Sequence, residues 1–283
     1  MVIISSDSTC DLSPELIEKY NIKIKPLYVV SDERSYVDGV DITAREVLEY
    51  QKRTGKLLKT SALNVADLED MFDEYGIENE IVHFSISSAM SSTYQNSVVA
   101  SEGRNAYCID SQNLSTGIGL MVLKACDLRD EGKSAKEIAE YIEDMKKRVD
   151  ASFVLDTLEY LHKGGRCSAI AALGANLLKL KPCIEVKNGS MGVGKKYRGQ
   201  LEKCITAYVK DRLANADTVE KGRIFVTHTC DDAHMQMVED TVKLIKELMP
   251  DCEVLTTTAG CTVSVHCGPN TLGVLFVRTN EIV

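Results

Sequence analysis

The sequence predicts an α/β protein with two lobes, a doubly wound, mostly parallel sheet in the first and a mixed α+β arrangement in the second. In the first half, short apolar runs rich in β-branched residues alternate with helix-like stretches. In the second half, strand-like runs outnumber long helices. The length of 283 residues exceeds that of a usual single domain, so we expect residues 1–150 and 151–283 to form the two lobes.

Four apolar runs predict the strands of the first lobe, and helix-start signals lie between them. The runs span residues 2–4, 26–30, 81–84 and 106–109. Ser13 followed by Pro14 predicts a helix start, because serine caps helices and proline fits the first helical position. Strands that alternate with helices favour a parallel sheet covered on both faces.

Two capping boxes predict further helices. Thr43 with Glu46 and Ser134 with Glu137 have the spacing at which hydroxyl and carboxylate each satisfy a free backbone N–H. The second box opens an amphipathic helix. Its predicted apolar face consists of Ile138, Tyr141, Ile142, Met145 and Val149.

The second half contains six predicted strands and one long predicted helix. The strand-like runs span residues 152–155, 183–187, 224–228, 253–257, 262–266 and 274–278. Asp231 is expected to cap the helix, with Met235, Val238, Val242 and Ile245 facing inward.

Charge and hydropathy exclude several classes of function. A net charge of −9 without a basic stripe disfavours nucleic acid as a partner. No apolar run reaches the roughly 20 residues of a membrane-spanning helix, and the N-terminal MVIISSDSTC lacks a basic start, so we expect a cytoplasmic protein without integral membrane association. The ten scattered cysteines form no CxxC pair and are expected to be reduced and mostly buried.

Five hydroxyl-rich segments follow or lie within predicted strands and could gather at one end of a sheet. They lie at residues 5–9, 60–61, 85–93, 111–116 and 256–258. Hydroxyls and free backbone N–H groups there would form a neutral cradle for a carboxylate or a phosphate. Each serine or threonine could instead merely cap the next helix.

Charged and ionisable side chains give further candidates. His266 follows a strand-like run and suits a carboxylate ligand, although a lone histidine is more often structural. Arg166 and Arg198 lie in basic, glycine-containing segments that could dock a partner or remain solvated loops. The other histidines lack metal-ligand spacing, and GxxxxGK[ST], HExxH and GxSxG are absent, so we expect no metal and no cofactor.

Six ordered blocks resemble the DegV family over nearly the whole chain. They are SDSTCDLSPE at 6–15, TS at 60–61, SSAMSSTYQNS at 87–97, FVLDTLEYLHKGGRCS at 153–168, KKYRG at 195–199 and HCGPN at 266–270. The block at 153–168 is the most specific. Two segments depart from the family pattern, in that its usual TSQPS reads TSALN at 60–64 and its SSGLSG reads SSAMSS at 87–92. The loop after His266 is a third departure, because it contains Cys267 and Asn270.

The resemblance implies a two-lobed DegV-like fold with one long-chain fatty acid, such as palmitate or oleate, in an apolar tunnel between or beside the lobes. It implies a non-catalytic subunit that presents the bound carboxylate to a separate ATP-dependent fatty acid kinase for acyl-phosphate formation. Carried over to this chain, the carboxylate ligands would be Thr60, Ser61, Ser91 and His266, supported by Ser92 and Ser115. Arg166 and Arg198 would face the kinase.

Two other functions stay open at this point. A lipid hydrolase or acyltransferase could use Ser91 as nucleophile and His266 as base, but it would need an orienting residue and an oxyanion hole that the sequence does not identify. A binding protein for another small anion would need the same cradle without an apolar tunnel.

Overall fold

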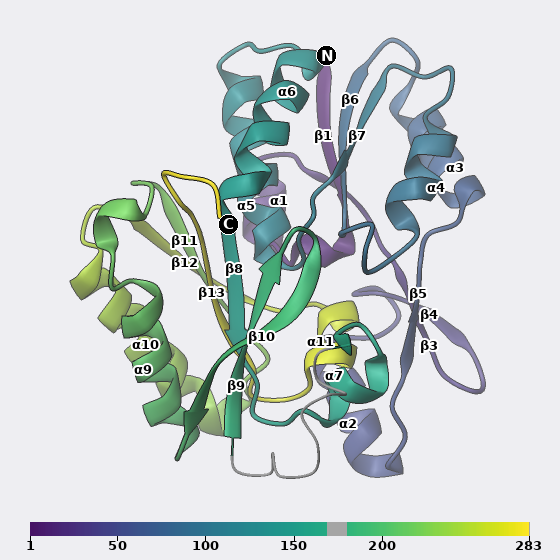
Figure 1. The fold of residues 1–283 in the computed structure, drawn as a ribbon. Coiled ribbons are helices and arrows are strands. Elements are labelled where there is room, and N and C mark those ends of the chain that lie inside the picture. Colours follow the sequence, from purple (N-terminus) through teal and green to yellow (C-terminus); the bar gives the residue numbers. More distant parts are fainter. Residues whose placement is uncertain (169–179, 283) are drawn as a thin grey trace.

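The structure, a computed structural model, describes residues 1–168 and 180–282. It contains a parallel sheet, a larger mixed sheet and a small antiparallel sheet, with helices around and between them (Figure 1). The α/β class predicted from the sequence is confirmed.

The parallel sheet has four strands in the order β2-β1-β6-β7. Its strands are β1 (Val2–Asp7), β2 (Lys23–Lys25), β6 (Glu80–Ser85) and β7 (Ala106–Asp110). Its helices are α1 (Pro14–Lys19), α3 (Val65–Tyr75), α4 (Thr93–Ala100), α5 (Thr116–Asp130) and α6 (Ala135–Met145). Figure 1 shows α5 and α6 on one side of this sheet and α3 and α4 on the other, as in a doubly wound sheet.

The small sheet and one helix extend the first half of the chain beside the parallel sheet. The antiparallel order is β4-β3-β5, with β3 (Tyr28–Val30), β4 (Ser35–Val37) and β5 (Lys59–Ser61). Helix α2 (Ala44–Thr54) opens with the predicted capping box of Thr43 and Glu46. The sequence patterns missed β2, β4 and β5 because three residues are too few to show a periodicity.

The mixed sheet has six strands in the order β10-β9-β8-β13-β11-β12. Its strands are β8 (Val149–Val154), β9 (Leu180–Lys187), β10 (Ser190–Arg198), β11 (Arg223–His228), β12 (Glu253–Thr258) and β13 (Leu272–Val277). The helices of this half are α7 (Glu159–Gly164), α9 (Leu201–Arg212), α10 (Met235–Leu248) and α11 (Cys261–Cys267). Figure 1 shows α9 and α10 along one face of the sheet. The described residues also form short 3₁₀ turns at Ser8–Cys10, Lys146–Arg148, Ala216–Thr218 and Asp232–His234.

Helix α5 lies between the two large sheets. Eleven of its fifteen residues are buried, far more than one apolar stripe would cover. The core cluster that contains Met121 of α5 also contains Phe84 of β6 and Phe153 of β8. One continuous core therefore joins both sheets, and the division into two lobes near residue 150 stays a prediction.

Three of the sequence predictions about local structure are wrong. Asp231 does not cap α10, whose N-cap residue is His234; Asp231 precedes the 3₁₀ turn Asp232–His234 and makes no side-chain capping hydrogen bond. Residues 262–266 form most of helix α11 and not a strand. The helix opened by Ser134 ends at Met145, so Val149 lies in β8, and Tyr141 is exposed on the helix surface. The KKYRG segment, considered as a possible loop, lies mostly in β10, which ends at Arg198.

The remaining helix and cysteine predictions agree with the structure. Ser13 and Ser134 cap α1 and α6 through their hydroxyls. In α10, Val238 and Ile245 are buried and Met235 and Val242 pack partly against them. None of the ten cysteines, which all lie among the described residues, forms a disulfide bond, and seven of them are buried.

Candidate functional site

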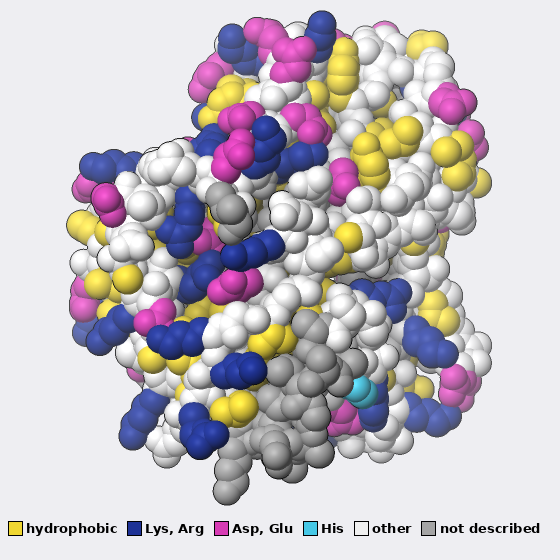
Figure 2. Space-filling view, viewed as in Figure 1, with side chains coloured by type: hydrophobic (Ala, Val, Ile, Leu, Met, Phe, Trp, Pro, Cys, Tyr) yellow, Lys and Arg dark blue, Asp and Glu magenta, His cyan; other side chains and the backbone are white. Residues whose placement is uncertain are grey.

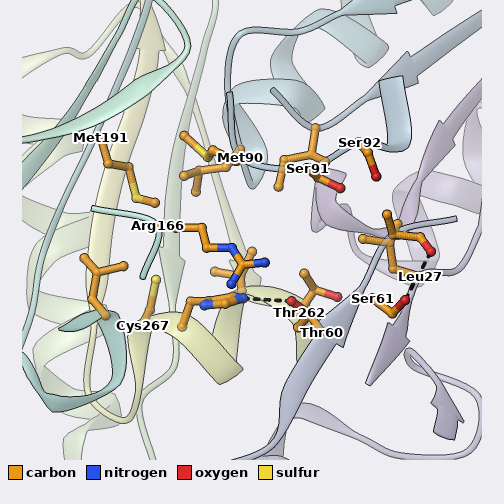
Figure 3. A pocket seen from close by; sticks show the side chains of 16 residues that line it. Leu27, Thr60, Ser61, Met90, Ser91, Ser92, Arg166, Met191, Thr262 and Cys267 are labelled. Carbon is orange, nitrogen blue, oxygen red and sulfur yellow. Dashed lines mark hydrogen bonds between the residues drawn. The ribbon is translucent and has the colours of Figure 1, made fainter. Parts of the chain in front are cut away.

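A pocket of about 320 Å³ lies where the parallel sheet, the small sheet and α11 meet. We call it the head pocket. Its polar lining comes from β5 and the loop before α4 on one side, and from α11 and the segment after α7 on the other. The polar residues are Thr60, Ser61, Ser91, Ser92, Arg166, Thr262 and His266 (Figure 3). The pocket therefore contains five of the six predicted carboxylate ligands.

His266 and Thr60 are directly paired across the pocket wall. The His266 Nε2 atom lies 2.9 Å from the Thr60 Oγ1 atom. This contact connects the last turn of α11 with the middle of β5 (Figure 3). Burial, and then the positive charge of Arg166, lower the pKa of His266 to about 4. The unliganded imidazole is therefore neutral near pH 7 and can donate or accept one hydrogen bond at each ring nitrogen, according to its tautomer.

The imidazole is held tightly against the backbone of α7. A Cβ atom on Gly164 would collide with the His266 Nδ1 atom, so only glycine fits at this position. Within residues 1–168 and 180–282, the buried Nδ1 atom has no hydrogen-bond partner. The ring is thus fixed by packing on one side and by Thr60 on the other.

Arg166 follows α7 and lies in the pocket wall. The Nη1 atom of Arg166 donates to the carbonyl of Gly164 at 2.7 Å, and Figure 3 shows the guanidinium group directed into the pocket. In the described part of the chain no carboxylate forms an ion pair with it. An unpaired guanidinium beside a neutral imidazole favours an anionic ligand.

The serine hydroxyls complete the opposite side of the pocket. Ser91 Oγ lies 3.0 Å from Thr93 Oγ1 and accepts a hydrogen bond from the Thr93 N–H. Ser92 is the N-cap residue of α4, yet its hydroxyl makes no capping hydrogen bond, and Ser61 is exposed. Helix capping therefore does not account for the Ser92 hydroxyl at this position.

Apolar side chains line the rest of the head pocket, and a second cavity adjoins it. The apolar residues are Leu27, Ala62, Ile86, Met90, Leu114, Leu161, Met191, Val263 and Cys267. Leu114, Val263 and Cys267 also line a narrow cavity between α11 and the strands β8, β11 and β13 of the mixed sheet. The head pocket thus has a polar end and an apolar end, and the apolar end adjoins the second cavity at these three residues.

A wider hollow of about 680 Å³ lies on the other side of the polar wall, and we call it the basic hollow. It shares Thr60, Arg166 and His266 with the head pocket. Its remaining lining includes Lys56, Lys59 and Lys163, and one acidic residue, Asp32. Lys56 pairs with Asp32 and Lys163 pairs with Glu159, but the charged side chains of the lining remain positive in sum. A group held by the shared wall could therefore be approached from a cationic side.

Two predicted residues lie outside the head pocket. The Ser115 hydroxyl donates to the buried carboxylate of Asp11 at 2.6 Å, and its role as a carboxylate ligand finds no support in this geometry. Arg198 is exposed at the end of β10 and does not line the pocket. Arg166, predicted to face a partner, lines both the head pocket and the basic hollow.

The geometry gives no support to a serine nucleophile. A catalytic serine would need hydrogen-bond contact with its base, but His266 Nε2 contacts Thr60, and Ser91 contacts Thr93. Within the described residues no acidic side chain orients the other imidazole nitrogen.

Among residues 1–168 and 180–282, no cluster of three or more His, Cys, Asp or Glu residues could hold a metal ion. No helix in that part of the chain has the length and apolar character to cross a bilayer. The predicted absence of a cofactor stays a prediction.

Comparison with known proteins identifies the family. The profile of the family described as "Uncharacterised protein, DegV family" matches residues 1–279. The chain belongs to the DegV family. A DegV domain-containing protein of Clostridium acetobutylicum is 34% identical over 97% of this chain and 98% of its own length. A second, from Clostridium perfringens, is 31% identical with the same coverage.

Solved DegV structures share the whole fold. A fatty-acid-binding DegV family protein from Thermus thermophilus has a TM-score of 0.88 and 28% identity, covering 98% of this chain and 99% of its own. DegV of Bacillus subtilis, described as a fatty acid binding protein, has a TM-score of 0.86 and 26% identity with the same coverage. A stearic acid-binding protein from Eubacterium ventriosum has a TM-score of 0.84 and 26% identity, covering 98% of both chains. These three proteins of the same fold are thus described as binding fatty acids, one of them stearic acid.

Sequence patterns missed several pocket residues. Leu27, Leu114, Leu161 and Met191 look like ordinary core residues and carry no signal of a site. Arg166 was identified as a candidate because it is a basic residue next to glycines, but the sequence could not show that its side chain lines the pocket.

Proposed function

We propose that this protein binds one long-chain fatty acid, with the carboxylate in the head pocket and the acyl chain along the apolar lining. The observation that carries the proposal is the combination in one pocket of the His266–Thr60 pair, the unpaired Arg166 and a continuous apolar wall. A small polar anion would not need that wall. The fatty-acid-binding DegV relatives support the same ligand class.

The energetics require both parts of the pocket. Burying about 15 methylenes at ~0.8 kcal/mol each would give roughly 12 kcal/mol of gross driving force, reduced by the cost of ordering the chain. Burying a carboxylate without partners would cancel much of that gain. The hydroxyls of Thr60 and Ser91, the imidazole of His266 and the guanidinium of Arg166 supply the missing donors.

The acyl chain would extend from the head pocket toward the narrow cavity beside the mixed sheet, because Leu114, Val263 and Cys267 line both. Ala62 and Met90, which lie in two of the segments that depart from the usual family pattern, also line the head pocket. These two positions are therefore the first candidates for differences in chain selectivity from other DegV proteins.

The same proposal includes a non-catalytic role in the cytoplasm, in which the protein presents the bound carboxylate to a separate ATP-dependent kinase. Two features support it. The basic hollow adjoins Thr60, Arg166 and His266, where a phosphoryl group would meet the carboxylate. Lysine and arginine side chains also gather over β9, β10 and α9 although the chain is acidic overall, and exposed Lys196 and Arg198 lie on β10 (Figure 2).

The first test is the identity of the co-purified ligand. The purified protein is denatured and extracted with organic solvent, and the extract is analysed by mass spectrometry. We expect a fatty acid of about 16 to 18 carbons at near-equal stoichiometry, with the roughly 15 methylenes assumed above. If no lipid is recovered even after incubation with a series of fatty acids, the carrier function is wrong and the small-anion alternative takes its place.

A further inference from the structure

The start of helix α11, which carries His266, is held by two buried aspartate side chains, Asp38 at the first turn and Asp11 just before it. Asp38 accepts hydrogen bonds from the backbone N–H groups of Cys261 and Thr262, each at 3.1 Å, and from the Thr262 hydroxyl at 2.7 Å. It also accepts one from the Ser8 hydroxyl at 3.0 Å. All four contacts therefore use Asp38 as an acceptor.

Asp11 holds the residue just before the same helix. Its Oδ1 atom accepts from the Gly260 N–H at 2.9 Å, and its Oδ2 atom accepts from the Ser115 hydroxyl at 2.6 Å. A Cβ atom on Gly260 would lie 2.9 Å from the same Oδ1 atom, so glycine is required for this close approach. Asp11 follows the 3₁₀ turn after β1, and its side chain thereby connects this segment with the start of α5 and the start of α11.

Asp11 and Ser115, which form one of these contacts, have strained backbone conformations. Asp11 has φ of 50°, and Ser115 has φ of 55° with ψ of −146°, a region that residues other than glycine rarely occupy. Strained residues persist only where surrounding contacts hold them. The Asp11–Ser115 hydrogen bond is such a contact, and Leu114 beside it lines both cavities.

The position of α11 decides the geometry of the head pocket. The helix has only seven residues, and Thr262 and Val263 at its start and His266 and Cys267 at its end all line the pocket. Its far end is tied by the Thr271 hydroxyl, which donates to the Cys267 carbonyl at 3.0 Å. Because the helix is this short, a displacement of its first turn would also displace His266 and move the imidazole away from Thr60.

We propose that Asp11 and Asp38 are positioning residues, a carboxylate brace that fixes α11 so that His266 meets Thr60 and the carboxylate of the ligand. This inference rests on the proposed fatty-acid binding for its functional consequence. Neither residue lines the head pocket, so both act through α11 and not by contact with the ligand. An amide could not replace the Asp38 carboxylate, because an NH₂ group would face N–H and O–H donors.

The decisive variant is Asp38→Asn, with Asp150→Asn as a matched control. Asp150 is equally buried, but it pairs with Arg212 and Arg278 and lies away from the pocket lining. Both variants should lower the unfolding temperature. Only Asp38→Asn should weaken palmitate binding, by about tenfold or more, and shift the nitrogen NMR signals of the His266 imidazole, which are assigned by their loss in His266→Gln.

A second variant covers the case in which Asp38→Asn fails to fold. Gly260→Ala keeps both carboxylates and displaces only Asp11, so it should give a smaller loss of palmitate affinity and a smaller shift of the His266 signals. If the folded variants keep the palmitate affinity and the His266 imidazole signals of the wild type, the proposed positioning role of Asp11 and Asp38 is wrong.

The imidazole signals are recorded without ligand as well. If the wild-type protein binds no fatty acid, the proposed function fails, while the ligand-free spectra of Gly260→Ala and Asp38→Asn still decide whether the brace positions His266.

Discussion

The two sides of the head pocket differ in chemistry and in origin. The first half of the chain supplies hydroxyls, from Thr60, Ser61, Ser91 and Ser92, whereas the second half supplies the ionisable groups of Arg166 and His266 and one hydroxyl, that of Thr262. The hydroxyl side is half-exposed, while His266 is packed against α7. Neither half alone contains both a neutral cradle and a positive charge.

This difference predicts which side of the head pocket contributes more to the fatty-acid affinity. A donor that is itself charged, as Arg166 is, or that becomes charged more readily beside the ligand, as His266 does, is attracted to the carboxylate more strongly than a neutral hydroxyl. A carboxylate left without such a donor loses much of its compensation for burial. Each hydroxyl has neighbours of the same kind, but His266 and Arg166 have no substitutes among the pocket residues. Substitutions on the basic side should therefore cost more than substitutions on the hydroxyl side.

The largest effect on binding is expected for His266→Ala. Loss of a charge-assisted hydrogen bond of about 1.5–3 kcal/mol should weaken fatty-acid affinity about 10- to 150-fold without loss of the fold. The measurement is a fluorescent fatty-acid titration, with circular dichroism to check folding. His234→Ala, which changes a histidine outside the pocket lining, is the control and should bind as the wild type does. Equal affinity in both variants would contradict the dominance of the basic side.

Thr60→Val should have a smaller effect, because it removes one neutral hydroxyl and keeps the shape. We expect affinity to fall about 2- to 12-fold, which corresponds to about 0.5–1.5 kcal/mol. Thr206→Val, which removes an exposed hydroxyl on α9, is the matched control. A loss as large as that of His266→Ala would show that the hydroxyl side matters equally.

Binding should also take up protons at mildly acid pH. Burial and Arg166 lower the pKa of His266 to about 4, and a bound carboxylate favours the imidazolium and raises that pKa again. Calorimetry at pH 6 in buffers of different ionisation enthalpy should show uptake of part of a proton, which disappears in His266→Ala. The lowered pKa also means that the contribution of His266 to stability, present above pH 6.5, is lost as the pH falls toward 4.

The smallest effect on binding is expected for Arg198→Ala, because Arg198 lies outside the pocket. Fatty-acid affinity should remain within about twofold of the wild type, the range usual for surface substitutions. Phosphorylation of the bound fatty acid by an added fatty acid kinase and ATP should nevertheless decrease. Normal phosphorylation by this variant would remove Arg198 from the proposed docking surface.

The sequence predicted the chemistry of the site better than its local structure. The resemblance to the DegV family implied Thr60, Ser61, Ser91, Ser92 and His266 together, and these residues line one pocket. The residue pattern alone showed only hydroxyl-rich loops and a lone histidine. Whether they bind a carboxylate stays a prediction.

Helix α11 shows why the local structure was harder. Its β-branched residues favour a strand, but Asp38, more than 220 residues earlier, accepts hydrogen bonds from its first turn and favours the helix. Ser115 shows the same limit, because its partner Asp11 lies 104 residues away. Such distant contacts leave no periodicity in the sequence.

The position of α5 restricts how the polypeptide can be divided. Because both broad faces of this helix are covered, one by each large sheet, a fragment that ends near residue 150 would expose to water the apolar surface that normally meets Phe153 and Leu275. Such a fragment would be prone to self-association, as large exposed apolar patches are. Recombinant expression, isotope labelling of one half or fusion at a mid-chain junction must therefore keep both sheets together.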